Sequence, residues 1–210
     1  MPELPEVETI VRDLRIKVLN RAFIDVWTDS PKIIKKPANF EELKKQIIGK
    51  KILKVWRRAK NIIFELSGGY SLLIHQKLTG HLLIGSWVLN NGHWQSKQKG
   101  ILQEKVNTYI HLMFWLSDDL MLALSDLRKF AKVELWEAKE LEESEGFKKL
   151  GPEPLEKSFT FIKFKEILKG KRGKALLRQR LRNGKALLRP SVNSGLRKGK
   201  TLLRPRLRTG

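Results

Sequence analysis

The apolar positions near the start of the chain follow a helical period, and the pattern predicts an amphipathic helix over residues 6–20. Pro5 and Glu6 suit the first turn of such a helix, because Pro needs no amide partner there and a negative charge is favoured at a helix N-terminus. The apolar stripe of this predicted helix consists of Val7, Ile10, Val11, Leu14 and Val18.

A different pattern follows the predicted helix. Short runs rich in Ile, Val, Phe and Trp alternate with turns that contain Gly, Asn or Asp, which is typical of β-strands. Residues 40–48 interrupt the strands with a short predicted helix. So many short strands behind a leading helix favour a mostly β fold with some α, a β-sandwich or barrel. The predicted strands are residues 22–28, 51–57, 62–66, 71–75, 81–89, 109–116, 120–124 and 132–137.

The pattern changes again in the last third of the chain. Residues 140–145 predict an acidic helix, residues 150–155 (LGPEPL) predict a turn or linker, and residues 159–168 predict another helix. A Gly-Lys-(Ala/Thr)-Leu-Leu-Arg unit then occurs three times, at irregular spacing that argues against a solenoid. We therefore expect a basic, poorly ordered C-terminal segment after a short helical region.

These changes divide the chain into three expected parts. Residues 1–150 form the β domain with its leading helix, residues 151–170 a linker and the start of the helical region, and residues 171–210 the basic tail.

The charge is strongly positive and uneven. The 210 residues include 43 Lys+Arg against 22 Asp+Glu, a net charge of +21, and 14 of these cations lie in residues 171–210, which contain no acidic residue. Such clusters favour a polyanionic partner, with nucleic acid first, because binding releases counterions from the phosphates. A basic protein such as a ribosome-associated factor would have the same composition, and charge alone does not separate the two.

The composition also excludes several classes. The absence of Cys excludes disulfides, thiol catalysis and Cys-based zinc sites, and the His residues lack ligand-like spacing, so we expect no metal and no cofactor. No apolar run is long enough to cross a membrane, and the acidic start is unlike a signal peptide. We expect a monomeric cytoplasmic protein, associated with the nucleoid if its partner is DNA.

The first residues carry the strongest candidate chemistry. Removal of Met1 would leave Pro2 with a free secondary amine, whose pKa near 8 leaves a sizeable unprotonated fraction at neutral pH. Such an amine can attack an electrophilic carbon and form an iminium, with the carboxylates of Glu3 and Glu6 as acid and base beside it. The alternative is that these residues only begin a helix, and on their own they favour that alternative.

The wider sequence resembles bacterial formamidopyrimidine-DNA glycosylase, a bifunctional base-excision repair enzyme. Residues 1–10 (MPELPEVETI) closely match its start, and Leu4 separates the chain from the sister endonuclease VIII group, which begins Pro-Glu-Gly-Pro. Four further segments match in the family's order, and the likeness covers roughly residues 2–168. These segments are residues 57–60 (RRAK), 74–80 (IHQKLTG, against His-Leu-Gly-Met-Thr/Ser-Gly), 124–130 (LSDLRKF, against Asp-Pro-Arg-Arg-Phe-Gly) and 150–155.

The resemblance implies a role for each matching residue. Pro2 would attack C1′ of the damaged nucleotide, and Glu3 would protonate the sugar ring oxygen. Glu6 would help to position the amine and the phosphates. Lys60 would hold a phosphate beside the lesion, where the alternative is one more exposed lysine. For His75, a phosphate ligand and a turn cap are equally good interpretations.

The resemblance also implies side chains that fill the gap left by an everted base. Arg128 and Phe130 match the family here, and Leu78 stands where Met is usual. The expected partner is therefore double-stranded DNA with an oxidised purine or an abasic site, and the expected reaction is base removal followed by β,δ-elimination.

The family's helix-two-turn-helix segment and four-cysteine zinc finger have no counterpart in this chain. This difference keeps open a catalytically impaired or inactive, non-specific DNA-binding remnant of the family. An N-terminal-proline tautomerase is a third class, but it predicts a shorter chain that acts on small acids.

Overall fold

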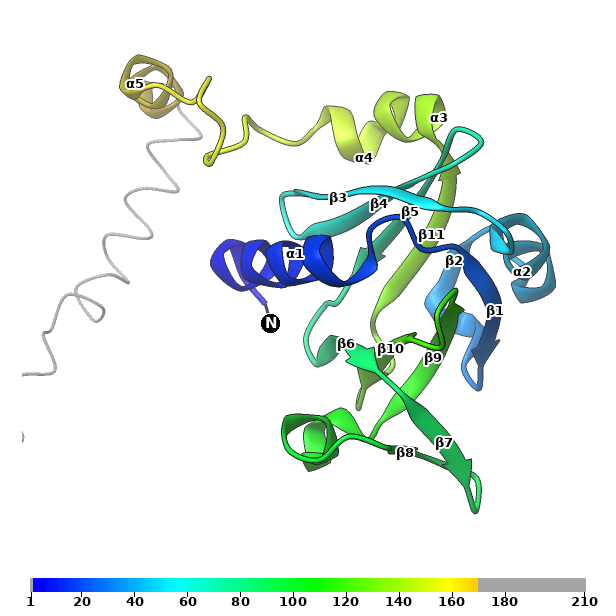
Figure 1. Ribbon diagram of the computed structural model, residues 1–210. Coiled ribbons are helices and arrows are strands. Elements are labelled where there is room, and N and C mark those ends of the chain that lie inside the picture. Colours follow the sequence, from blue (N-terminus) through cyan, green and yellow to red (C-terminus); the bar gives the residue numbers. More distant parts are fainter. Residues whose placement is uncertain (1, 170–210) are drawn as a thin grey trace, which may run out of the picture. The chain divides into compact units, whose positions relative to one another are not determined.

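Two β-sheets and a leading helix make up the body of the protein (Figure 1). The computed structural model describes residues 2–169. The chain divides into two compact units, residues 1–153 and residues 154–210. In the first unit, α1 (Leu4–Val18) precedes every strand.

The first sheet has four antiparallel strands in the order β1-β9-β10-β6. The second has five strands in the order β2-β11-β5-β4-β3, antiparallel except for the β11/β2 pair, and β7 and β8 form a separate hairpin. The strands are β1 (Phe23–Thr28), β2 (Ile34–Lys36), β3 (Ile52–Arg58), β4 (Asn61–Leu66), β5 (Tyr70–His75), β6 (Gly80–Gly85), β7 (Trp87–Asn90), β8 (His93–Ser96), β9 (Ile110–Leu116), β10 (Met121–Asp126) and β11 (Lys132–Glu137).

Short helices lie between some of the strands and after the last one. Three of them are 3-10 turns, η1 (Pro31–Ile33), η2 (Ile101–Gln103) and η3 (Lys105–Asn107). The α-helices after α1 are α2 (Phe40–Ile47), α3 (Ala138–Glu143) and α4 (Glu145–Lys148) in the first unit, and α5 (Phe161–Lys169) in the second.

The main core lies between the two sheets and confirms the predicted mostly β sandwich with a leading helix. Phe114 of the first sheet and Phe64 of the second are both fully buried in the same cluster. The predicted stripe of α1 enters this cluster through Val7, Val11, Leu14 and Val18, and the helix contacts β3 and β4 of one sheet and β6 of the other. Burial of the stripe therefore fixes the start of the chain beside both sheets.

The structure corrects the predicted elements at several points. The first helix ends at Val18 rather than at residue 20, and the helix predicted over residues 140–145 is interrupted at Ser144. The strands β2 and β8 lie where no strand was predicted. The first helix also begins at Leu4 rather than at residue 6, because Glu3 is its N-cap and Pro5 lies in its first turn. The single strand predicted over residues 81–89 is two strands, which separate after Gly85. A Cβ at Gly85 would lie 2.4 Å from Gln98 Oε1 and 2.7 Å from Leu102 Cδ1, so side chains of a later segment pack closely against the chain where the two strands separate. The expected basic tail, residues 171–210, lies outside the described residues.

Candidate functional site

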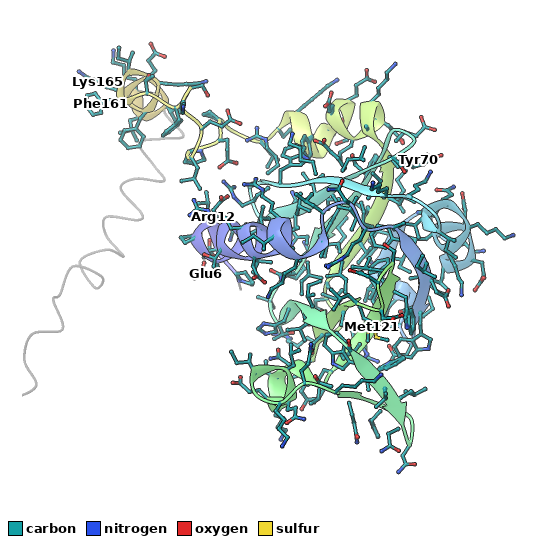
Figure 2. All side chains as sticks on the ribbon, in the orientation of Figure 1. Glu6, Arg12, Tyr70, Met121, Phe161 and Lys165 are labelled. Carbon is teal, nitrogen blue, oxygen red and sulfur yellow. The ribbon has the colours of Figure 1, made fainter. Side chains whose placement is uncertain are left out.

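The start of α1 brings three of the predicted residues together. Pro2 is partly exposed and directly precedes the N-cap residue Glu3, whose backbone N–H donates to Glu6 Oε2 at 3.0 Å. Figure 2 shows Glu6 at the N-terminal end of the helix. Two exposed carboxyl side chains therefore flank the first residues of the chain, where the helix dipole also favours anions.

Lys60 reaches the same place from the turn between β3 and β4. Its Nζ lies 2.7 Å from Glu3 Oε2, and the lysine side chain is 29% exposed. Lys60 is therefore more than one exposed lysine among many, since it joins the β3–β4 turn to the start of α1. A cation and two carboxylates surround the position from which an amine at residue 2 would act.

A buried ion-pair network lies behind this turn, and sequence reasoning missed it. Arg57 Nε donates to Glu8 Oε2 at 3.1 Å, and Arg57 Nη1 donates to Glu153 Oε2 at 3.0 Å. Glu153 lies in the segment that the sequence predicts to be a turn or linker. The segment has no helix or strand, but Glu153 is only 7% exposed, and nothing in the local pattern indicates its burial.

The hydrogen bonds of this network lower the pKa values of both of its carboxyl groups. Burial alone would raise the pKa of Glu153, but hydrogen bonds from Arg57 and from the Ala59 amide outweigh it and lower the pKa below 4.5. Burial likewise opposes ionisation of Glu8, and hydrogen bonds from Arg57 and Arg12 again leave its pKa lowered. All members of the network are therefore charged at neutral pH.

His75 ends β5 near Lys60 and caps the turn that follows. Its Nδ1 accepts a hydrogen bond from the Lys77 backbone amide at 3.0 Å, so the neutral ring carries its proton on Nε2. Burial, and then the positive charges of Lys77, Lys60 and Lys132, lower the pKa of His75 to about 4. The ring is neutral at neutral pH and retains one N–H donor, which suits a phosphate oxygen, so capping and phosphate binding are compatible.

This low pKa predicts a pH effect on stability. Unfolded His75 takes up a proton near pH 6.5, whereas the folded side chain does so only near pH 4. The free energy of unfolding should therefore fall as the pH is lowered from 6.5 to 4. Urea titrations at pH 4.5, 5.5 and 6.5 measure this free energy. In His75→Asn it should fall less steeply with decreasing pH than in the wild type. In the control His93→Asn, at an exposed site, it should fall as steeply as in the wild type. Parallel slopes for His75→Asn and wild type would contradict this assignment.

Asp126 holds together the two loops that carry the remaining candidates. The side chain is 1% exposed and accepts from the backbone amides of Phe130 and Ala131, each at 2.7 Å. Its other oxygen accepts from the Thr79 hydroxyl, and the Arg128 amide lies 3.3 Å from both Thr79 Oγ1 and Asp126 Oδ1. The sequence contains Asp126 in a matching segment, but no role followed from the pattern.

Leu78, Arg128 and Phe130 are thus neighbours in space. Leu78 is 41% exposed and Phe130 51% exposed, so Phe130 is not a core aromatic. The Arg128 guanidinium lies 4.6 Å from the centroid of the Phe130 ring. Leu78 and Phe130 share a surface pocket with four lysines, namely Lys32, Lys35, Lys77 and Lys129. An exposed apolar surface beside several lysines is a suitable shape and charge for contact with a nucleic-acid duplex.

The turn after β5 connects the two groups, because it begins at His75 and carries Leu78. Gly80 ends the turn, and a Cβ there would lie 2.4 Å from Gln76 O, so only glycine permits the close approach. Within residues 2–169, no cluster of His, Asp and Glu is arranged to hold a metal ion. None of the helices in that same range is both long and apolar enough to cross a bilayer.

The fold and the site define a class: a basic β-sandwich whose leading helix begins a candidate site with two exposed carboxylates and a lysine. The family model of the formamidopyrimidine-DNA glycosylase N-terminal domain matches residues 1–133. This chain belongs to the formamidopyrimidine-DNA glycosylase family, as its resemblance in sequence indicates.

Individual members of this family are similar in sequence to the chain over most of its length. The chain is 36% identical over 196 residues to the enzyme of Pelotomaculum thermopropionicum, covering 93% of this chain and 62% of that protein. It is 36% identical over 179 residues to the enzyme of Carboxydothermus hydrogenoformans, covering 84% of this chain and 58% of the relative. The chain therefore spans about three fifths of these relatives' length.

The fold also matches solved structures. The Lactococcus lactis protein in complex with DNA containing an abasic site aligns with a TM-score of 0.64 and 29% identity, covering 80% of this chain and 56% of that one. The same protein with DNA containing a benzylated formamidopyrimidine lesion aligns with a TM-score of 0.60 and 31% identity, covering 73% and 50%.

Proposed function

We propose that this protein is a DNA glycosylase/AP lyase that removes oxidised purines through a Schiff base on Pro2. The observation that carries the proposal is the ion pair between Lys60 and Glu3, which places a cation and two carboxylates around the first residues of α1. The partner would be double-stranded DNA that contains an oxidised purine or an abasic site. No cofactor is needed, and the reaction would occur in the cytoplasm at the nucleoid.

The first chemical step would form an iminium. The lone pair of the Pro2 nitrogen attacks C1′ of the deoxyribose and the bond from C1′ to the base breaks. The base leaves with the proton that the Pro2 nitrogen loses when it forms the new bond. Glu3 protonates the ring oxygen, so that the sugar opens and the nitrogen becomes a charged iminium. At an abasic site the same attack on the C1′ aldehyde releases water instead of a base.

Elimination would follow from the charge of the iminium. It acidifies the C2′ proton, whose removal breaks the C3′–O bond, and a second elimination breaks the C5′–O bond. Hydrolysis then returns free Pro2 and releases the sugar fragment. Glu6 holds the Glu3 backbone and so helps to position the amine, while Lys60 and His75 would hold phosphates beside the lesion.

The loops held by Asp126 would supply the rest of the interface. Leu78, Arg128 and Phe130 would enter the duplex and occupy the space that the everted nucleotide leaves. Because Arg128 already stacks on Phe130, the two side chains would enter as a preformed unit.

A second candidate is a DNA-binding remnant without catalysis, favoured by the surface on which four lysines surround Leu78 and Phe130, because such a surface can bind DNA without any chemical step. Incubation with a duplex containing an abasic site, followed by borohydride reduction, separates the two. We expect a covalent adduct with the abasic duplex and none with undamaged duplex. Binding in a gel-shift assay without any adduct would overturn the enzyme and leave the remnant.

A further inference from the structure

We propose that Glu153 is a positioning residue of the proposed active site, acting through Arg57 to hold Lys60 and the β3–β4 turn against the start of α1. The inference rests on the proposed function and extends it to a residue that does not itself reach the surface of the site.

Burial and pairing single out this carboxylate. Glu153 is 7% exposed and the Arg57 side chain only 3% exposed, whereas charged side chains are almost never buried unless they are paired. The two terminal guanidinium nitrogens of Arg57 donate to the two oxygens of Glu153, with Nη1 3.0 Å from Oε2. This two-point contact fixes direction as well as distance.

The same pair controls the residue before Lys60. Arg57 Nη1 donates to Ala59 O at 2.9 Å, and the Ala59 amide donates to Glu153 Oε2 at 3.3 Å. Both backbone polar groups of Ala59 are thus held from outside the turn. Ala59 has a φ of +52°, which is unfavourable for a residue with a Cβ, so the turn depends on such contacts.

Arg57 also connects the turn to the helix. Its Nε donates to Glu8 Oε2 at 3.1 Å, and Glu8 lies five residues after Glu3, between one and two turns further along the helix. The Lys60–Glu3 ion pair is partly exposed, with Glu3 55% exposed, and such pairs hold geometry weakly. We therefore infer that the buried Arg57–Glu153 pair fixes the distance between the β3–β4 turn and α1, and that this distance lets Lys60 reach Glu3.

Glu153→Gln tests this role in the full chain, because it keeps the shape of the side chain and removes its charge. We expect the single-turnover rate of adduct formation to fall about tenfold, with less than a twofold change in the half-saturating concentration of abasic duplex. Tm should fall by about 5–10 °C. The control Glu145→Gln, at an exposed ion pair, should leave the rate of adduct formation and the Tm unchanged.

A second variant separates positioning from stability. Replacing the pair with apolar residues, Arg57→Met with Glu153→Leu, should recover most of the lost Tm, since apolar side chains can substitute for a buried ion pair. The rate should remain low because the Ala59 contacts are lost. Recovery of both Tm and rate would show that the pair is only structural and would overturn the proposal.

Two further readouts depend on Lys60. If Glu153 acts through the turn, Lys60→Ala should cost less in the Glu153→Gln background than in the wild type, and additive losses would contradict the proposal. Amide hydrogen exchange of residues 58–61 should also rise at least tenfold in Glu153→Gln. The exchange measurement tests whether Glu153 holds the turn, and it does not depend on adduct formation. If the wild type forms no adduct, the proposed function is overturned. If exchange of residues 58–61 does not rise in Glu153→Gln, the positioning role of Glu153 is overturned.

Discussion

Pro2→Gly is expected to lower the yield of the borohydride-trapped adduct by at least about 100-fold, the largest effect of any single substitution considered. A secondary amine condenses directly to a charged iminium, whereas the primary amine of glycine gives a neutral imine that must gain a proton before elimination. Glycine also removes the ring that restricts the backbone before Glu3. The measurement is the initial rate of adduct formation on an abasic duplex with the enzyme in excess.

Pro5→Ala is the matched control. Pro5 lies in the first turn of the same helix and is exposed, but its nitrogen is part of a peptide bond. The control should keep wild-type adduct formation. Mass spectrometry of each protein must show that Met1 has been removed, since only then is the residue 2 amine free. An undiminished adduct in processed Pro2→Gly would assign the nucleophile to another amine.

Asp126→Ala is expected to lower the free energy of unfolding by about 3–5 kcal/mol. The carboxylate is 1% exposed and accepts the backbone amides of Phe130 and Ala131 at 2.7 Å. Alanine would leave both amides without their partner, and each unsatisfied buried donor costs about 1–3 kcal/mol. Urea unfolding at neutral pH measures the change.

Asp126→Ala should also affect DNA binding, because the loop that Asp126 holds carries Arg128 and Phe130. We expect Asp126→Ala to weaken binding of an abasic duplex under conditions in which the variant is still folded. Asp13→Ala is the control, since Asp13 is 53% exposed and, among residues 2–169, its ion pair is with Lys17 on the helix surface. Its effect should stay below about 0.5 kcal/mol. Equal stability losses in the two variants would contradict the role assigned to Asp126.

Much of the fold could be predicted because burial in strands and helices follows a local period. The stripe of α1 and every strand of the two sheets except β2 were visible as apolar repeats, and the main core buries many of the residues that those repeats indicate. The prediction of a single strand over residues 81–89 was wrong for a tertiary reason that the apolar repeat does not contain. Gly85 lies against Gln98 and Leu102, which are close to it only after folding.

The candidate site divides in the same way. Pro2, Glu3 and Glu6 are close together in the sequence, so their proximity needed no tertiary information. Lys60 was matched by resemblance alone, and its contact with Glu3 depends on the packing of α1 beside β3. The pairing of Leu78 with Phe130 likewise depends on β10 lying beside β6, which brings their two loops together.

The sequence by itself determined the leading helix, the mostly β body, the chemistry available at residue 2 and the family, because each of these depends on patterns within short stretches of consecutive residues. Only the tertiary structure decided that Glu153, in an apparent linker, is a buried partner of Arg57, and that Asp126 organises a loop. The physical reason is that charge burial is a property of surroundings: a carboxylate 96 residues away in the chain determines whether Arg57 is solvated or paired.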